Sequence, residues 1–472
     1  MDNSSTGMLK FLVPRIPSMM RAALAHSVYM SPTSTKWDLR TELTVHVLRS
    51  LMSGDKPSPV GKIQASTLRG PGPKGKMWVA ETSIPAPSDD GLREAVVKSV
   101  DEMNEGGEVY SVEKLSTPMR AEWTGFRPNV GNEDPLPDIS EEEKYKKLMA
   151  EPSRTSKTTV LYFHGGAYYL CSLATHRVNV SKLAKACNGR ALAVEYRLAP
   201  QVAFPGQLLD ALNSYLYLLY PPPGSLHEPV AASEIVFAGD SAGGNLAFSL
   251  LQLLLQLHRT KPASAANPTV HYNGKSVEVP LPAGVTANSG WFDVTRSMPS
   301  LQTNAKYDYL PLRITTMQFL VFRRTIMLCH PLVSPLAAKD WSGAPPLWIE
   351  TGEEMLTDED AVVAVRAASQ GVTVQWEQYE AMPHCFGMLL PALATSSRCM
   401  KSWGDFCRRC VEGDVKTNGT WIAAKTGQEK EVDVAKVTGL KWEDAVARMK
   451  ESQSKRLKGW EKEGKAMPKP NL

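Results

Sequence analysis

The sequence lacks a strong excess of charge of either sign. Its 472 residues carry 53 Lys and Arg against 49 Asp and Glu, which gives a formal net charge of +4. Proteins that bind nucleic acid gather many more cations on one stripe, often interleaved with aromatic residues. No Arg-rich stripe of that kind is present in this sequence. We therefore expect no nucleic-acid partner.

The sequence also lacks a secretory signal and an apolar run that could cross a membrane. A span needs roughly 18 apolar residues; the run 246–257 is too short, and the N-terminal stretch 8–30 is broken by prolines and arginines. We expect an intracellular protein, cytoplasmic or peripherally membrane-associated and not secreted. The Lys, Arg, Met and Leu of 8–30 are compatible with contact to a membrane surface. The alternative is that this segment only packs on the rest of the protein.

Cysteine is scarce and unevenly placed. There are seven cysteines, an odd number scattered over a long chain, which argues against a disulfide framework. Cys407 and Cys410 form a CxxC pair, but no second pair accompanies it. Two thiols on one helical turn are therefore expected rather than a zinc or redox site. Cys385 is given no role.

The middle of the chain has a regular pattern that its two ends lack. Between 158 and 400, apolar strand-like runs alternate with helical patterns, which predicts an α/β fold with a mostly parallel sheet and helices on both faces. We expect an N-terminal region over 1–150, a central domain over 151–410 and a charged C-terminal extension over 411–472. Smaller features are predicted too: helices at 36–52 and 442–460, a strand near 76–82, and an inserted hairpin turning at Asn273–Gly274.

The run Gly239-Asp240-Ser241-Ala242-Gly243 has the G-x-S-x-G spacing of a nucleophile elbow. A serine on a tight strand-to-helix turn needs small neighbours, because a side chain at 239 or 243 would collide with the helix or the strand. The helix that follows directs its N-terminal N–H groups at developing negative charge. An apolar strand pattern precedes the motif and a helical pattern follows it. Ser241 is therefore the predicted nucleophile.

A second Gly-rich turn, His164-Gly165-Gly166-Ala167, ends another strand pattern. Glycines there let backbone N–H groups approach a substrate oxygen closely, which suits an oxyanion hole. Upstream of a nucleophile elbow, this is a better interpretation than an ordinary turn.

The general base should be a histidine after the last strand, since the order nucleophile, acid, histidine accompanies such an elbow. His384 meets that order and lies in a loop-like stretch. The acid should follow the strand 346–352, where five carboxylates crowd together: Glu353, Glu354, Asp358, Glu359 and Asp360. Most of them are expected to form the solvated first turn of the next helix. Spacing alone leaves the choice among them open.

With these motifs assembled, the chain resembles the hormone-sensitive-lipase family of α/β-hydrolases, which includes arylacetamide deacetylases and fungal steryl acetyl hydrolases. The resemblance covers about 158–400 and includes HGGA at 164, YRLAP at 196, GDSAGG at 239, HPLVSPL at 330, TGEEMLTDE at 351 and MPHCFG at 382. It implies an α/β-hydrolase fold with a helical N-terminal cap. By the family spacing the acid is Glu354, with Asp358 as the alternative.

The resemblance also implies the chemistry. Oxyanion donors are expected among Gly165, Gly166 and Ala167, with Ala242 beside the nucleophile; Ala167 stands where the family pattern has a third glycine. The implied activity is serine-dependent hydrolysis of a small, hydrophobic or lipid-like carboxylic ester such as a steryl ester, with no metal or organic cofactor. An amidase or deacetylase with the same triad is the alternative. A ligand-binding pseudoenzyme is disfavoured because Ser241, Glu354 and His384 are all present.

Overall fold

A ten-stranded sheet organises the chain in the computed structural model, which describes residues 12–52, 60–104 except 69 and 71, 112–312 except 113, and 327–462. Six neighbouring pairs in its centre are parallel, and antiparallel pairs lie at both edges. This confirms the predicted α/β fold with a mostly parallel sheet. The strand order is β1 (Met77–Ile84), β2 (Met119–Phe126), β4 (Arg190–Val194), β3 (Thr159–Phe163), β5 (Ile235–Asp240), β8 (Gly284–Asn288), β9 (Leu347–Gly352), β10 (Val374–Tyr379), β11 (Asn418–Ile422) and β12 (Glu429–Val432).

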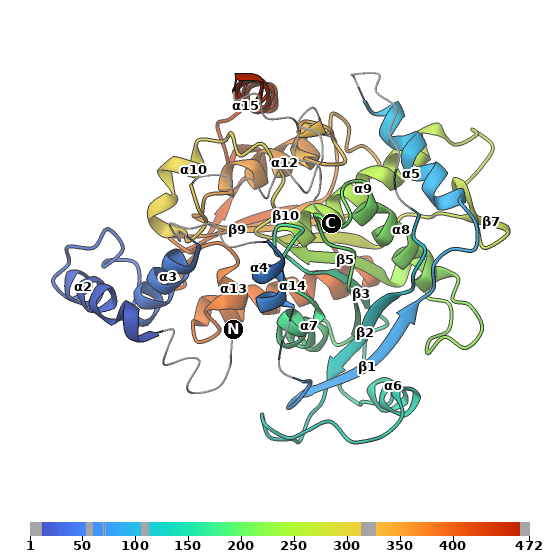
Figure 1. The fold of residues 1–472 in the computed structure, drawn as a ribbon, viewed down its shortest axis with the longest axis horizontal. Helices are drawn as coiled ribbons and strands as arrows, with labels where there is room; N and C mark the ends of the chain where they lie inside the picture. Colours follow the sequence, from blue (N-terminus) through green and yellow to red (C-terminus); the bar gives the residue numbers. More distant parts are fainter. Residues whose placement is uncertain are drawn as a thin grey trace.

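Helices cover both faces of this sheet, and each face has its own apolar core (Figure 1). Side chains alternate along a strand, so that Leu161 and Phe163 of β3 enter one core while Val160 and Tyr162 enter the other. The first core is closed by α5 (Gly91–Glu102), α8 (Gly206–Leu219), α9 (Ala242–Thr260) and α12 (Thr357–Ser369). The second is closed by α7 (Leu173–Ala186) and α14 (Ala394–Glu412).

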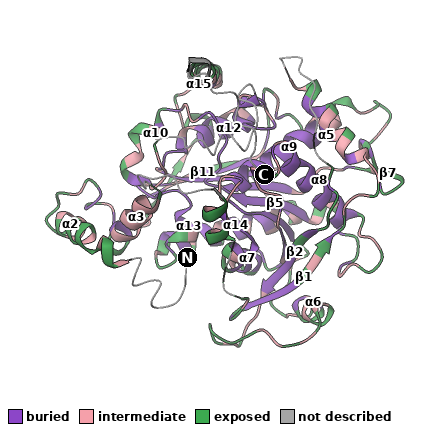
Figure 2. Ribbon diagram, in the orientation of Figure 1, coloured by how far each residue is buried: buried purple, intermediate pink, exposed green. Residues whose placement is uncertain are grey.

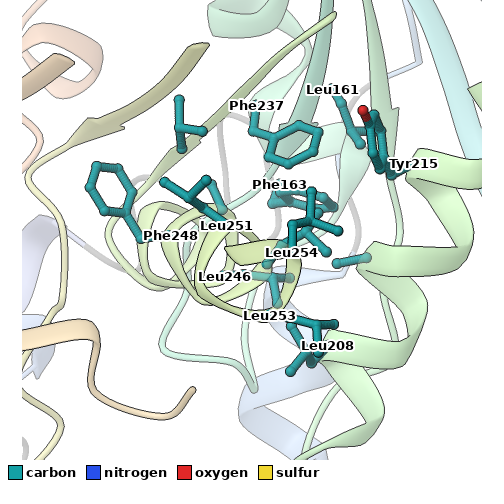
Figure 3. Packing of buried hydrophobic residues seen from close by; sticks show 14 of the residues in the cluster. Leu161, Phe163, Leu208, Tyr215, Phe237, Leu246, Phe248, Leu251, Leu253 and Leu254 are labelled. Carbon is teal, nitrogen blue, oxygen red and sulfur yellow. The ribbon is translucent and has the colours of Figure 1, made fainter. Parts of the chain in front are cut away.

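The long helix α9 lies against the centre of the sheet. Its leucines meet Phe163 and Phe237 from the strands and Leu208 and Tyr215 from α8 (Figure 3). Each fully buried Leu or Phe stabilises the fold by about 1.5–3 kcal/mol relative to exposure. This packing fixes the first turn of α9, which directly follows Ser241.

The two ends of the chain contribute more to the sheet than the sequence predicted. The region 1–150, which we expect to be an N-terminal cap and extension, also supplies β1 and β2 as one edge of the sheet. Beyond 410, β11 pairs with β10 and β12 pairs with β11. β1 and β2 have eight residues each, whereas β11 and β12 have only five and four. The residues of β12 are mostly polar and exposed, so the strand character of this second edge is weak in sequence. Neither expected boundary is therefore a boundary of the sheet.

Other local predictions are confirmed. The helix expected at 36–52 is α3 (Leu39–Met52), and the helix expected at 442–460 is α15 (Trp442–Lys462). The inserted hairpin is β6 (Thr269–Tyr272) with β7 (Lys275–Glu278), and both turn residues, Asn273 and Gly274, have positive φ. Remaining helices include α2 (Ile16–Ser27), α4 (Val60–Thr67), α6 (Glu141–Met149) and α13 (Phe386–Leu389).

All seven cysteines are free thiols. Among the helices in the described ranges, none combines the length and the apolar character that a membrane crossing requires.

Candidate active site

Ser241 occupies a tight turn between β5 and α9. Its φ of 53° and ψ of −119° are sparsely populated for a residue with a side chain. A Cβ at Gly243 would lie 1.9 Å from the Phe163 carbonyl oxygen, and one at Gly239 would lie 2.3 Å from the Gly243 backbone. The two glycines are therefore sterically required, as the motif predicted. The turn is held by the Ser241 N–H, which donates to the Asn288 carbonyl at 3.0 Å.

His384 lies in the loop between β10 and α13, directly beside Ser241. Its Nε2 is 2.9 Å from Ser241 Oγ, and its Nδ1 is 2.6 Å from Glu354 Oε2. Because the carboxylate can only accept, Nδ1–H donates to Glu354 and Nε2 is left to accept the Ser241 proton. The neighbouring Cys385 points elsewhere: its thiol is buried, which raises its pKa well above the usual value, and its N–H donates to Ser289 Oγ.

Glu354 is the carboxylate that meets the histidine. It is fully buried, and its second oxygen accepts hydrogen bonds from Thr351 Oγ1 at 3.0 Å and from the Gly352 N–H at 3.3 Å. The alternative acid, Asp358, instead accepts the Ser300 N–H at 2.8 Å. Of the two, the structure brings only Glu354 together with His384 and Ser241.

Two of the other acids after β9 do not form a solvated turn, contrary to the sequence-based expectation. Glu359 and Asp360 are both fully buried, and burial raises their pKa values well above the usual range. The first turn of α12 is covered because the segment after β8 packs on it; the Asp293 N–H, for example, donates to Glu359. A sequence pattern of charges could not reveal that cover.

The environment of His384 favours its protonated form. Burial lowers the pKa of His384, but Glu354, then Asp308 and Asp240, outweigh burial and raise it above the usual value. Asp308 is 1% exposed and follows the short helix Ala305–Tyr307. No motif marked Asp308 in the sequence, because it approaches the site only through the fold.

The predicted oxyanion donors divide into two groups. The Gly165 N–H donates to Asp240 Oδ1 at 3.0 Å, so the prediction that it serves a substrate oxygen is wrong. The reason is that Gly165 faces the β5 end directly, where a Cβ would lie 2.2 Å from Asp240 Oδ2. The next two residues, Gly166 and Ala167, form the second group, and both have positive φ, 112° and 52°. Ala242 is the first residue of α9, where the N–H has no partner within the helix.

Asp240, which directly precedes Ser241, forms hydrogen bonds with the turn His164–Ala167 (the oxyanion turn) and with neighbouring side chains. Besides Gly165, it accepts a hydrogen bond from the Tyr162 hydroxyl at 2.6 Å, and His176 Nε2 lies 3.4 Å away. Burial raises the pKa of Asp240, but His176 and Tyr162 outweigh it, and the pKa is lowered. Asp240 lies inside the recognised motif, so its position was available from the sequence although its role was not. His164 stacks on Tyr196 at 4.5 Å and stays out of the triad geometry.

Comparisons with known proteins place the chain among α/β hydrolases. The alpha/beta hydrolase fold family matches residues 160–388. An acetyl-hydrolase of Streptomyces hygroscopicus is 32% identical over 272 residues, 56% of this chain and 80% of that protein. The neutral cholesterol ester hydrolase 1 of Mus musculus is 26% identical and is aligned over 49% of this chain and 67% of its own length.

Solved structures show the same fold. The crystal structure of EstE5 soaked with p-nitrophenyl butyrate aligns with a TM-score of 0.57 at 21% identity, covering 80% of this chain and 100% of its own. An esterase from the bacterial hormone-sensitive lipase family aligns with a TM-score of 0.53 at 22% identity, covering 79% and 99%. The chain therefore belongs to the alpha/beta hydrolase fold family and is a carboxylic-ester hydrolase.

Proposed function

We propose that the protein cleaves hydrophobic carboxylic esters through an acyl-enzyme on Ser241. The observation that carries this proposal is the continuous chain of hydrogen bonds from Glu354 through His384 to Ser241 Oγ. The turn with Gly166 and Ala167 and the N-terminus of α9 lie at the adjoining strand ends. This arrangement supports a site in which nucleophile, base and orienting acid act beside anion-stabilising amides.

In the proposed mechanism, His384 Nε2 takes the hydroxyl proton as Ser241 Oγ attacks the ester carbonyl carbon. The amides of Gly166, Ala167 and Ala242 stabilise the tetrahedral oxyanion. Protonated His384, which Glu354 stabilises, then gives its proton to the departing alkoxide, and the alcohol leaves. Water repeats these steps with Ser241 as the leaving group. This sequence needs no metal and no organic cofactor.

The N-terminal helices are proposed to form the cap over the site. On one side, Trp37, just before α3, donates from Nε1 to the carbonyl of Ala381 at 2.6 Å, three residues before His384. On the other side, Gln64 of α4 donates to the carbonyl of Ala199, and Thr67 accepts the N–H of Cys171 beyond the oxyanion turn. A cap of this kind shapes the substrate pocket, so its side chains would set the choice of ester.

A lipid-like substrate, such as a steryl ester, is proposed because an apolar face lies beside this cap. Five side chains at spacings of three and four residues along α2 and its ends are 45–67% exposed: Val13, Ile16, Met20, Leu24 and Val28. Residues 12–30 contain Arg15 and Arg21 but no acid. An apolar stripe flanked only by cations suits the surface of an anionic bilayer. Figure 2 shows α2 at the periphery with its exposed side outward. We propose peripheral membrane association through this face.

The mechanism is tested by labelling with a fluorophosphonate probe and mapping the modified peptide. Labelling at Ser241, and its absence in Ser241→Ala, is expected. An unlabelled Ser241 in the folded protein would contradict the enzyme hypothesis and favour a ligand-binding protein.

Substrate class needs a separate panel of short aryl esters, long-chain esters, steryl esters and the amide that matches one aryl ester. We expect the highest kcat/KM on hydrophobic esters. A higher kcat/KM on the amide than on its ester would favour the amidase alternative.

A further inference from the structure

A third buried carboxylate holds the loop that carries Glu354. Asp308 Oδ2 accepts the N–H of Met355, the residue that directly follows Glu354, at 2.8 Å. Its Oδ1 accepts the N–H of Tyr309 at 2.7 Å, and the Tyr309 ring lies 6.0 Å from the His384 ring. Asp308 therefore fixes the backbone on the far side of the acid and also places an aromatic ring against the base.

The segment that contains Asp308 is in turn held by the N-terminal helix α3. The guanidinium of Arg49 is half-buried and donates to three backbone carbonyls: Asp308 at 2.7 Å, Ala305 at 3.3 Å, and Lys306. A planar fork with several donors can bind several carbonyls at once, which a lysine ammonium cannot match in geometry. More than 250 residues separate Arg49 from this segment in the sequence.

The same N-terminal region also touches the loop that carries His384. Trp37 donates to the Ala381 carbonyl, and Lys36 pairs with Glu380. The Ala381 N–H donates to Glu353 Oε2 at 3.0 Å, which links the histidine loop to the acid loop. Residues 36–49 therefore contact the loop that carries His384 directly, and they contact the loop that carries Glu354 through Asp308.

We infer that α3 and the turn before it form a positioning element for the triad, with Arg49 acting through Asp308 on Glu354. This inference rests on the proposed serine mechanism. Arg49 and Asp308 are positioning residues, because neither touches Ser241 or the reacting atoms. Through this element, the position of the Glu354 carboxylate depends on the N-terminal helices, which also carry the proposed membrane face.

Charge provides a readout that distinguishes positioning from general stability. The groups that face His384 come from three places in the fold: Glu354 after β9, Asp308 and Tyr309 in the segment held by Arg49, and Asp240 at the end of β5. Asp308 is one of the acids that favour the imidazolium. Loss of its charge, or its release toward water, lowers the pKa of His384 and moves the acidic limb of kcat/KM to lower pH.

The test compares Arg49→Ala, Arg49→Lys and Asp308→Asn with the native full-length protein on a soluble aryl ester. Arg40→Ala is the matched control, since Arg40 lies on the same helix with an exposed side chain. Active sites are titrated with a fluorophosphonate, so that kcat is expressed per reactive serine. Any fraction that fails to fold is then removed from the comparison.

We expect Arg49→Ala and Asp308→Asn to lower kcat per titrated site by about tenfold or more, with KM nearly unchanged. Both should move the acidic limb to lower pH. Arg49→Lys should recover part of kcat, and Arg40→Ala should match the native protein.

The inference is overturned if Arg49→Ala retains kcat per site within about twofold of native, or if kcat falls with no movement of the acidic limb. Ser241→Ala is measured alongside. Activity that persists in Ser241→Ala contradicts the serine mechanism and the positioning role together. Loss of activity there, with native kinetics in Arg49→Ala, contradicts the positioning role alone.

Discussion

The nucleophile and the acid of this triad are held in different ways. The turn around Ser241 is fixed by its own short neighbourhood: Gly239, Gly243 and the adjoining strand end leave no space for any other path. The loop around Glu354 is fixed by distant segments, through Asp308 and then Arg49. The first arrangement is steric and local, whereas the second is polar and spans most of the chain. The turn around Ser241 and the loop around Glu354 should therefore respond differently to mutation.

The largest effect is expected for the acid itself. Glu354→Gln removes the charge that orients and stabilises His384, and kcat should fall by roughly 10²- to 10⁴-fold. Asp358→Asn, the matched control from the same acidic run, should stay within about threefold of native because Asp358 only accepts the Ser300 N–H. Kinetics on an aryl ester decide the matter. Equal losses in both variants would mean that the acid side is a diffuse cluster rather than one defined partner.

A steric test follows for the nucleophile turn. Gly243→Ala places a Cβ 1.9 Å from the Phe163 carbonyl oxygen, so we expect a loss of about 3 kcal/mol or more in the free energy of unfolding. Gly439→Ala, where nothing lies within 4 Å, should be neutral within about 0.5 kcal/mol. Denaturant unfolding measures both. A native stability in Gly243→Ala would show that the turn is not sterically fixed.

The pH profile gives an intermediate effect. His384 must be neutral to accept the Ser241 proton, and its pKa is raised by Glu354 and Asp308. As the pH is lowered, activity should therefore fall at a higher pH than it would for a histidine with the usual pKa. Activity should be full only above the raised pKa of His384. In Glu354→Gln the limb should move to lower pH in whatever activity remains. A profile that is flat through this range would remove His384 as the base.

The smallest effect on catalysis is expected at α2, the outer end of the N-terminal helices. Met20→Ser with Leu24→Ser should weaken binding to vesicles of phosphatidylcholine and phosphatidylserine by about tenfold or more, since each loses apolar contact with lipid. Turnover of a soluble aryl ester should not change. Val178→Ser, at an exposed apolar residue of α7, is the control. Unchanged vesicle binding in the double variant would assign α2 a packing role only.

The elbow was predictable from the sequence because its requirements are written in adjacent residues. Small residues at 239 and 243, an apolar strand before them and an apolar helix after them leave one arrangement. The order of the chain likewise located His384. The resemblance to a known family was needed to select Glu354, because five nearby carboxylates have the same local character.

What the sequence could not reveal depends on tertiary contacts. The amide of Gly165 is occupied by Asp240, and the acids at 359 and 360 are buried. Asp308 and Arg49 carry no motif, since backbone groups of distant segments are their partners. The strand expected near 76–82 is β1, but the edge strands β2, β11 and β12 became clear only once their pairing was known. These features depend on burial and approach, which residue spacing does not encode.

The proposed serine mechanism is tested most directly by trapping the acyl-enzyme. The native protein is mixed with an aryl ester, quenched in acid during turnover, digested and examined by mass spectrometry. We expect one acyl group on the peptide that contains Ser241, and a larger trapped fraction with a slowly hydrolysed acyl group. Turnover with no acyl group on Ser241, or with the acyl group on another side chain, would contradict it.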